Sequence, residues 1–308
     1  MYFCACLIPH GVVMERKRIL FIVNPISGNR NKKRFSGLAT PELAGMNVSY
    51  EIVYTEGPGH ATQLAAAAVG AVDVVAAVGG DGTLNEVARG LMGSDTPMAI
   101  VPAGSGNGLA RCLQIPLDTT NAVLLINSGS VERIDTGMVN ENPFLSVAGI
   151  GLDANTAYDF AADPRRGFLT YARYALRNYA HYHPEEVRIT MDEGETLTCH
   201  PLLVTFANSN QFGYHAIIAP QASLQDGLLD TCVLTRPSWL RAPFAAAKLM
   251  RGRLHKSRYH TDYQAAHIRV ERTAPGVVNI DGEPLMMPAT LDVRIVPKNL
   301  LVVCPEKR

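Results

Sequence analysis

Apolar runs separated by polar, glycine-containing turns divide the first half of the chain into short units. The run at 74–78 is continuous, which is typical of a strand buried on both faces of a sheet, and the segments 18–23, 48–54 and 97–101 are further strand candidates. Helical patterns follow them, among them 60–69 and 119–126. Strands that alternate with helices predict a doubly wound α/β domain with a parallel sheet. Ligands of such a sheet bind at the carboxyl ends of its strands.

The second half of the chain has many strand candidates and few helical ones. The candidates lie at 131–139, 143–151, 187–191, 202–207, 229–234, 267–272, 277–280 and 291–296. This pattern predicts an antiparallel β-sandwich. A chain of 308 residues is long enough for two domains, and we place them at 16–136 and 137–308, after an N-terminal extension at 1–15.

The stretch 74–87 joins an apolar strand to a helix through the turn Gly79-Gly80-Asp81-Gly82-Thr83. Thr83 followed by Glu86 is a capping-box pattern, which predicts that the helix begins at Thr83. Glycines in the turn would let a phosphate approach the backbone N–H groups at the positive end of the helix. Because Asp81 would repel that phosphate unless a cation lay between them, the stretch indicates phosphate binding with Mg²⁺. An ordinary tight turn is the alternative.

Composition narrows the class of protein. Hydrophobic residues make up 47% and charged residues 18%, and Lys+Arg and Asp+Glu both number 28, so nothing global indicates nucleic acid. Six scattered cysteines lack metal-ligand spacing, which favours reduced thiols in a cytoplasmic protein. No apolar run is long enough to span a membrane. Residues 1–13 make a poor signal peptide, and Met14 looks like a natural start.

Two further polar turns follow strands, Asn24-Pro25-Ile26-Ser27-Gly28 and Gly104-Ser105-Gly106-Asn107. Either one alone would be an ordinary loop between a strand and a helix. Three such turns on one predicted edge of a parallel sheet are stronger evidence for a phosphate site.

From about Arg18 to the C-terminus, these motifs resemble the catalytic domain of diacylglycerol kinases, which also occurs in sphingosine and ceramide kinases. The resemblance implies a Rossmann-like first domain, a sandwich as second domain, a C-terminal tail that returns to the first domain, and ATP bound between the two. The implied nucleotide contacts are Asn24, Thr55, Gly79, Gly80, Asp81, Gly82, Thr83, Leu84, Asn85, Gly104, Ser105 and Asn107. NAD kinases and phosphofructokinases share the Gly-Gly-Asp turn, and NAD kinases also have a β-rich second domain, whereas the Asn24–Gly28, Gly104–Asn107 and Asp281–Glu283 motifs together favour the lipid kinases. Many bacterial members of this family have aspartate where this chain has Gly108. The sequence Gly-Ser-Gly-Asn at 104–107 is more similar to the corresponding turn of sphingosine kinases.

Asp281-Gly282-Glu283 and Ser223–Leu228 would elsewhere be simple turns. By resemblance, the first motif faces the nucleotide turn. Asp281 ranks first as the general base for a lipid hydroxyl and Glu283 is its partner, and the two roles could be exchanged. Asp81 completes the predicted catalytic acids. The second motif would hold a structural Mg²⁺ through Asp226 and the carbonyls of Ser223 and Leu228.

Two segments are candidates for contact with lipid. The stretch 165–182 is helical and rich in tyrosine and arginine, and 236–260 carries Trp239 and seven basic residues without an acid. Each could equally be an ordinary surface helix, whereas basic residues beside apolar ones suit an anionic membrane surface.

The expected activity is ATP-dependent phosphorylation of diacylglycerol. A sphingoid base or ceramide is the alternative acceptor, NAD is less favoured, and an inactive nucleotide-binding regulator is ranked lowest. We expect a cytoplasmic, peripherally membrane-associated protein, and homodimers are common among the relatives.

Overall fold

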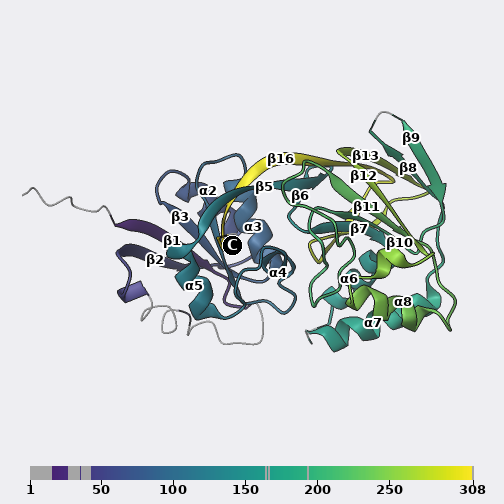
Figure 1. Ribbon diagram of the computed structural model, residues 1–308, viewed down its shortest axis with the longest axis horizontal. Helices are drawn as coiled ribbons and strands as arrows, with labels where there is room; N and C mark the ends of the chain where they lie inside the picture. Colours follow the sequence, from purple (N-terminus) through teal and green to yellow (C-terminus); the bar gives the residue numbers. More distant parts are fainter. Residues whose placement is uncertain are drawn as a thin grey trace, which may run out of the picture.

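The computed structural model describes residues 16–26, 35, 43–163, 165, 167–192 and 194–306. The predicted extension at 1–15, and Ser27 and Gly28 of the first turn, lie outside these described residues. Parallel strands begin one sheet in the order β2-β1-β3-β4 (Figure 1). These strands are β1 (Lys17–Val23), β2 (Val48–Tyr54), β3 (Val74–Gly79) and β4 (Met98–Pro102).

Helices cover both faces of these parallel strands. They are α2 (His60–Ala68), α3 (Asp81–Leu91), α4 (Gly108–Cys112) and α5 (Thr119–Ser128). Alanines of α2 and apolar residues of α3 form one buried cluster with one face of the sheet, and α5 packs in a second cluster on the other face. Every residue of β3 is buried, as the continuous apolar run predicts.

The second half of the chain adds an antiparallel six-stranded sheet in the order β12-β11-β10-β7-β14-β15. Its strands are β7 (Val147–Gly151), β10 (Leu203–Ala207), β11 (Leu229–Leu234), β12 (His260–Ala265), β14 (Gly276–Ile280) and β15 (Glu283–Met287). The first sheet extends across from it through β16 (Thr290–Cys304), β13 (His267–Arg272), β8 (Val187–Met191) and β9 (Glu195–Cys199). Apolar side chains of both sheets form a shared core, so this half is a sandwich. Its helices are α6 (Leu152–Ala161), α7 (Phe168–His181), α8 (Ala242–Met250) and the 3₁₀ turn η2 (Leu254–Lys256).

A two-stranded ribbon connects the two halves (Figure 1). Strand β5 (Ser130–Val139) pairs with β16 on both sides of an irregularity between Val296 and Leu300. The early part of β16 pairs with β13 of the sandwich, and Val302 pairs with Met98 of β4. The end of the chain therefore supplies a strand to the first sheet. At the irregularity, buried Asp135 accepts hydrogen bonds from the N–H groups of Gly227 and Lys298.

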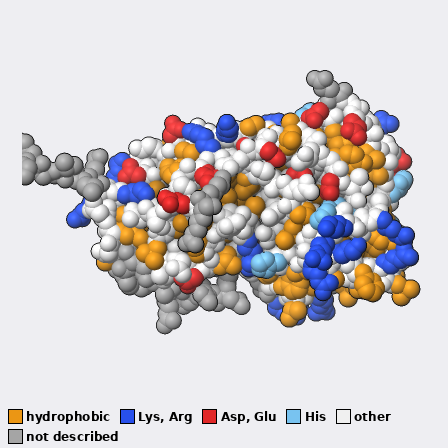
Figure 2. Space-filling view, in the orientation of Figure 1, with side chains coloured by type: hydrophobic (Ala, Val, Ile, Leu, Met, Phe, Trp, Pro, Cys, Tyr) orange, Lys and Arg blue, Asp and Glu red, His pale blue; other side chains and the backbone are white. Residues whose placement is uncertain are grey.

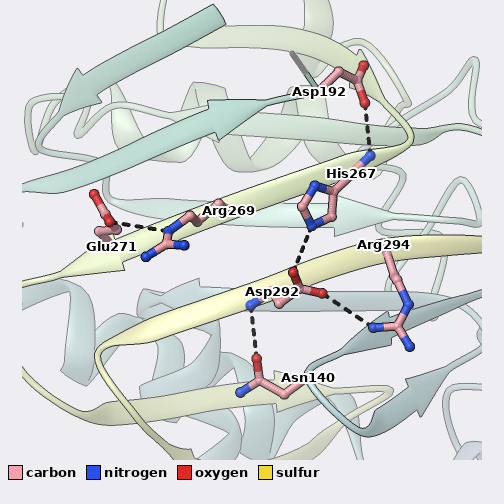
Figure 3. Close-up of polar contacts among 7 residues, drawn as sticks. All are labelled: Asn140, Asp192, His267, Arg269, Glu271, Asp292 and Arg294. Atoms are coloured by element: carbon pink, nitrogen blue, oxygen red, sulfur yellow. Dashed lines mark hydrogen bonds and ion pairs between the residues drawn. The ribbon is translucent and has the colours of Figure 1, made fainter. Parts of the chain in front are cut away.

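Polar contacts on the outer face of the sandwich fix β13 against β16 (Figure 3). The ring of His267 lies 2.7 Å from the carboxylate of Asp292, which also pairs with Arg294 at 3.3 Å. The backbone N–H of Asp292 donates to Asn140, in the turn between β5 and β6 (Asn142–Phe144). The hydrogen bond from His267 is the main cause that lowers the pKa of Asp292. These residues are about half exposed, so we assign them a role in strand register.

Several predicted boundaries are wrong. The single strand predicted at 143–151 is two strands, since β6 belongs to the first sheet and β7 to the second. Strands β9, β12 and β15 and helix α6 were not predicted. Within the described residues, no helix is long and apolar enough to cross a bilayer.

Candidate active site

Two glycine-rich turns meet at the carboxyl ends of β3 and β4. The N–H of Ala103 donates to the carbonyl of Gly79 at 2.7 Å. A Cβ atom on Gly104 would lie 2.5 Å from the Cα of Gly80, so the two turns touch backbone to backbone. The side chain of Asn107 exchanges two hydrogen bonds with Gly104 and fixes the second turn, in a left-handed conformation with φ of 51°. Glycine is therefore required where the turns cross.

The ends of β1 and β2 lie beside these turns. Asn24 donates from its side-chain amide to the hydroxyl of Thr83 at 3.0 Å, and Thr55 donates its N–H to the carbonyl of Val23. Ser105 is exposed at the tip of its turn, whereas the side chain of Leu84 is buried in the core, so only its backbone could face a ligand. Apart from Ser27 and Gly28, which are not described, the three predicted turns thus share one edge.

Helix α3 begins at Asp81, with Gly80 as its N-cap, and not at Thr83. The predicted capping box is wrong because Glu86 faces the neighbouring helix. Its carboxylate accepts hydrogen bonds from the N–H groups of Gly59 and Ala61 at the start of α2. Within the described chain, no side chain caps α3 at Gly80. The N–H groups of its first turn and the positive end of its dipole therefore face the glycine turns, which is an arrangement that binds phosphate.

Asp81 points from α3 towards the turn after β4. One of its carboxylate oxygens accepts from the N–H of Gly108 at 2.9 Å, and the other would lie 3.1 Å from a Cβ on Gly106. Burial, and after it the negative charge of Asp281, raise the pKa of Asp81 to about 6. Two neighbouring half-buried carboxylates favour a bound cation, which would relieve their repulsion.

Asp281 reaches this edge from the second domain, at the turn between β14 and β15. Its carboxylate accepts four hydrogen bonds, from the side chain of Asn85 on α3 and from three successive backbone N–H groups. The three backbone donors are those of Leu145, Ser146 and Val147. Asn85 also donates to the carbonyl of Pro143. The N–H groups of Leu145 and Ser146 donate to Asp281 and not to a neighbouring strand, and this is where the predicted strand at 143–151 is interrupted. Asp281 therefore holds the helix, the chain between β6 and β7, and the β14–β15 turn together.

Glu283 lies beside the first turn of α3. A Cβ on Gly82 would lie 2.4 Å from a carboxylate oxygen of Glu283, so glycine at 82 makes room for this acid. Among the described residues, the carboxylate of Glu283 has no hydrogen-bond or ion-pair partner. Burial, and then the charge of Glu86, raise the pKa of Glu283, while Arg89 acts in the opposite direction. An unpaired carboxylate with a raised pKa is suited to accept a proton.

Arg89 is a site residue that the sequence motifs do not contain. It donates to the side-chain oxygen of Asn85 at 2.8 Å and lies near Glu283. Asp81, Asn85 and Arg89 are spaced by four residues, so they share one face of α3. In the sequence, this spacing of four residues could have placed Arg89 beside Asp81 and Asn85.

A loop of the second domain covers the turn at Gly106–Gly108. A Cβ on Gly213 would lie 3.2 Å from the Cα of Gly106, and one on Gly108 would contact the backbone of Gln211 and Gly213 at 3.4–3.5 Å. Any side chain at position 108 would therefore lie directly against the loop. The N–H of Gly108 donates a hydrogen bond to the carboxylate of Asp81.

The predicted structural Mg²⁺ site lies apart from these acids, in the turn before β11. Asp226 is exposed and accepts from the N–H of Leu228, and Ser223 accepts from the N–H of Gln225. The negative charge of Asp226 contributes, after burial, to raising the pKa of Asp230 to about 6. Carboxylate and carbonyl oxygens are the donors that Mg²⁺ prefers, and this Mg²⁺ site stays a prediction.

Comparisons with known proteins agree with this arrangement. Residues 18–139 match the diacylglycerol kinase catalytic domain, and residues 146–304 match the YegS C-terminal NAD kinase beta sandwich-like domain. The chain is 32% identical over 283 residues to the diacylglycerol kinase of Bacillus subtilis strain 168, covering 88% of this chain and 90% of that protein. It is 28% identical over 280 residues to "Probable lipid kinase YegS-like" of Pseudomonas aeruginosa strain UCBPP-PA14, covering 88% and 89%.

Solved structures share the fold. A crystal structure of a diacylglycerol kinase from Bacillus anthracis strain Sterne superposes with a TM-score of 0.72 at 22% identity, over 94% of this chain and 97% of that one. Yeast NADH kinase superposes with a TM-score of 0.54 at 10% identity, over 96% and 85%. The chain belongs to the diacylglycerol kinase-like family of lipid kinases. It is a kinase, and its family implies ATP as the phosphoryl donor.

Proposed function

We propose that this protein transfers the γ-phosphoryl group of ATP to the hydroxyl of a membrane lipid, with diacylglycerol as the foremost substrate and phosphatidic acid as the product. One observation carries the proposal. Two acids of the second domain, Asp281 and Glu283, lie beside the uncapped N-terminus of α3 and its glycine turns. Backbone N–H groups there suit the phosphates, and an acid beside them suits the acceptor alcohol.

Within this site, Glu283 is the better proton acceptor. The carboxylate of Asp281 is already used by four hydrogen bonds, and protonating it would break at least one of them. Glu283 lies at the start of β15 with its carboxylate turned in against Gly82, and this carboxylate is unpaired among the described residues. We therefore exchange the roles that the sequence motif suggests, with Glu283 as general base and Asp281 as the residue that positions the second domain on α3.

The Glu283→Gln variant tests this assignment. Since the pKa of Glu283 is raised, wild-type turnover should increase with pH as this carboxylate ionises. We expect Glu283→Gln to lower kcat by about 10²–10⁴-fold, to leave KM for ATP nearly unchanged, and to remove the acidic limb of the pH–rate profile.

Asp281→Asn is the matched control, because an amide can keep only part of the hydrogen bonding of the carboxylate. We expect it to lower the free energy of unfolding as well as activity, whereas Glu283→Gln should leave stability unchanged. If Asp281→Asn removed the acidic limb and Glu283→Gln retained it, Asp281 would be the general base and Glu283 would not.

A cation would neutralise charge where Asp81 approaches Asp281. The fit rests on the position of Asp81 between the glycine turns, where its carboxylate contacts Gly106 and Gly108, and near enough to Asp281 for that negative charge to help raise its pKa. Mg²⁺ bound with ATP would supply charge neutralisation of the phosphates. Asp81 would hold it on the side of α3, and Asp226 with the carbonyls of Ser223 and Leu228 would hold a separate structural ion.

Helices α7 and α8 offer a surface for the membrane that carries the substrate. Seven large apolar side chains are exposed on these helices or directly before α8, at Phe168, Leu169, Leu176, Trp239, Leu240, Phe244 and Met250. The ring of Trp239 contacts Tyr179 of α7 at 5.2 Å, so the two segments adjoin. Figure 2 shows Lys and Arg side chains gathered with apolar ones over this part of the molecule. Basic residues near an anionic bilayer contribute about 1 kcal/mol each, and exposed apolar side chains insert at its interface.

Replacing Leu240 and Phe244 by aspartate should weaken binding to vesicles of phosphatidylglycerol and phosphatidylcholine by about tenfold or more in a flotation assay. Leu117→Asp, at an exposed leucine of the first domain, is the control and should bind as wild type does. Equal binding by the double variant would exclude this surface.

A panel of acceptors with labelled ATP tests the substrate. The proposal expects transfer to diacylglycerol above transfer to a sphingoid base, ceramide or NAD. The NAD arm is included because the second domain matches an NAD kinase beta sandwich-like family. Transfer to NAD without transfer to any lipid would overturn the proposal.

A further inference from the structure

Three potential metal ligands come together in the sandwich, away from the acids of the candidate active site. They are the thiol of Cys232 on β11 and the side chains of His260 and Asp262 on β12. The scattered cysteines of the sequence gave no sign of this, because the three residues meet only through pairing of β11 with β12. Cys232 lies directly opposite Asp262, and His260 is two residues from Asp262 on the same face of the strand.

The spacing of the ligand atoms fits one ion. The sulfur, the imidazole nitrogen and the carboxylate oxygen all lie within 4.8 Å of one another, and Nε2 of His260 is 3.3 Å from Asp262. Bonds of about 2.0–2.3 Å to a tetrahedral ion separate neighbouring ligand atoms by roughly 3.3–3.8 Å. Small side-chain movements would therefore bring all three into contact with one ion.

The imidazole of His260 supplies the independent evidence. Its side chain is fully buried, yet among the described residues neither ring nitrogen has a hydrogen-bond partner. Buried polar groups without a partner are rare, and one such group directed at a thiol and a carboxylate indicates an absent ligand. The 3.3 Å ion-pair contact with Asp262 involves Nε2 alone, so it leaves Nδ1 unpaired.

We propose that Cys232, His260 and Asp262 form a binding site for a divalent transition metal ion, with Zn²⁺ as the preferred ion. Sulfur, nitrogen and oxygen donors together suit Zn²⁺ and do not suit Mg²⁺. His255 is the candidate for the fourth position, since it lies on η2, which packs against β12, and its buried Nδ1 has no partner among the described residues. Without it, water would complete the coordination.

The position of the site gives the ion a structural role. Cys232 precedes the segment that contains α8 and η2, and His260 and Asp262 directly follow it. An ion held by all three would fasten both ends of this segment to the sheet. The site does not depend on the proposed lipid kinase activity, and its test does not use that activity.

Cobalt substitution tests the proposal directly. The full-length protein without a histidine tag is freed of metal with a chelator and titrated with Co²⁺. We expect one equivalent to bind with a thiolate-to-cobalt charge-transfer band and the intense visible bands of a tetrahedral ion, and Zn²⁺ to displace it. Cys232→Ser should abolish the charge-transfer band, and Asp262→Asn, at a partly exposed position, should weaken binding by about tenfold or more.

Two controls separate this site from other cysteines. Cys199→Ser on β9, and a variant with serine at both Cys4 and Cys6, should keep the spectrum and the affinity of wild type. Circular dichroism verifies that each variant is folded. The proposal is wrong if metal-free wild type gives no charge-transfer band at stoichiometric Co²⁺. It is also wrong if Asp262→Asn keeps the band with unchanged affinity while replacement of Cys4 and Cys6 removes it.

Discussion

At the scale of single residues, the carboxylates of Asp281 and Glu283 differ in a way that their sequence motif does not reveal. The motif predicts that both acids face the glycine turns, and the structure brings both to α3. Their different hydrogen bonding depends on the backbone of Leu145, Ser146 and Val147, which lies far away in the chain. Local patterns can therefore indicate a site, whereas the division of roles within it depends on tertiary contacts.

Asp81 gives a prediction of stability against pH. Its pKa is raised from 3.8 to about 6, so the folded state favours the protonated carboxyl. The stability from this preference is present below pH 4 and is lost as pH rises through about 6. Asp81→Asn should therefore be more stable than wild type at pH 8, by about 1–3 kcal/mol, although inactive.

Urea denaturation of both proteins between pH 4 and pH 8 measures this difference. The two curves of unfolding free energy should converge towards pH 4. A difference that stays constant over this range would show that ionisation of Asp81 carries no cost in the folded protein.

At the scale of elements, strands and helices of the first domain follow closely from their apolar patterns. The predicted strand at 48–54 and the observed β2 coincide, and the predicted helix at 60–69 ends one residue later than α2. β12 and β15 are the edge strands of their sheet, and neither has a clear alternation, since β12 is mostly polar and β15 begins with Glu283 and Pro284. Their position at the sheet edge, and not their intrinsic strand propensity, explains why these strands were not predicted.

Glu86 shows how an element can be stabilised by a residue of another. It was predicted to cap its own helix, but its carboxylate accepts from Gly59 and Ala61 at the start of α2. We expect Glu86→Ala to lower the free energy of unfolding by about 1–2 kcal/mol, because two N–H groups lose their acceptor. Thermal denaturation measures it, with Glu86→Gln as the control that keeps an acceptor oxygen. If both variants matched wild type, the cap would contribute nothing.

At the scale of the whole molecule, the β5–β16 ribbon makes the two domains depend on each other. The last residues of β16 pair with both β4 and β5 in the first domain. We expect removal of residues 300–308 to destabilise the first domain and to speed amide hydrogen exchange in β4. Removal of residues 305–308, which follow β16, is the control and should leave exchange unchanged. Slow exchange in β4 of the longer deletion would contradict this dependence.

The same ribbon has a consequence for synthesis. Translation delivers the parallel strands of the first domain before the sequence of the second domain, whereas the strand that lies beside β4 follows that sequence. Until β16 has been made, the β4 edge of the nascent sheet has unpaired backbone groups, and such edges promote aggregation. The first domain is therefore completed only after the second has been made, and not in the order in which the two are encoded.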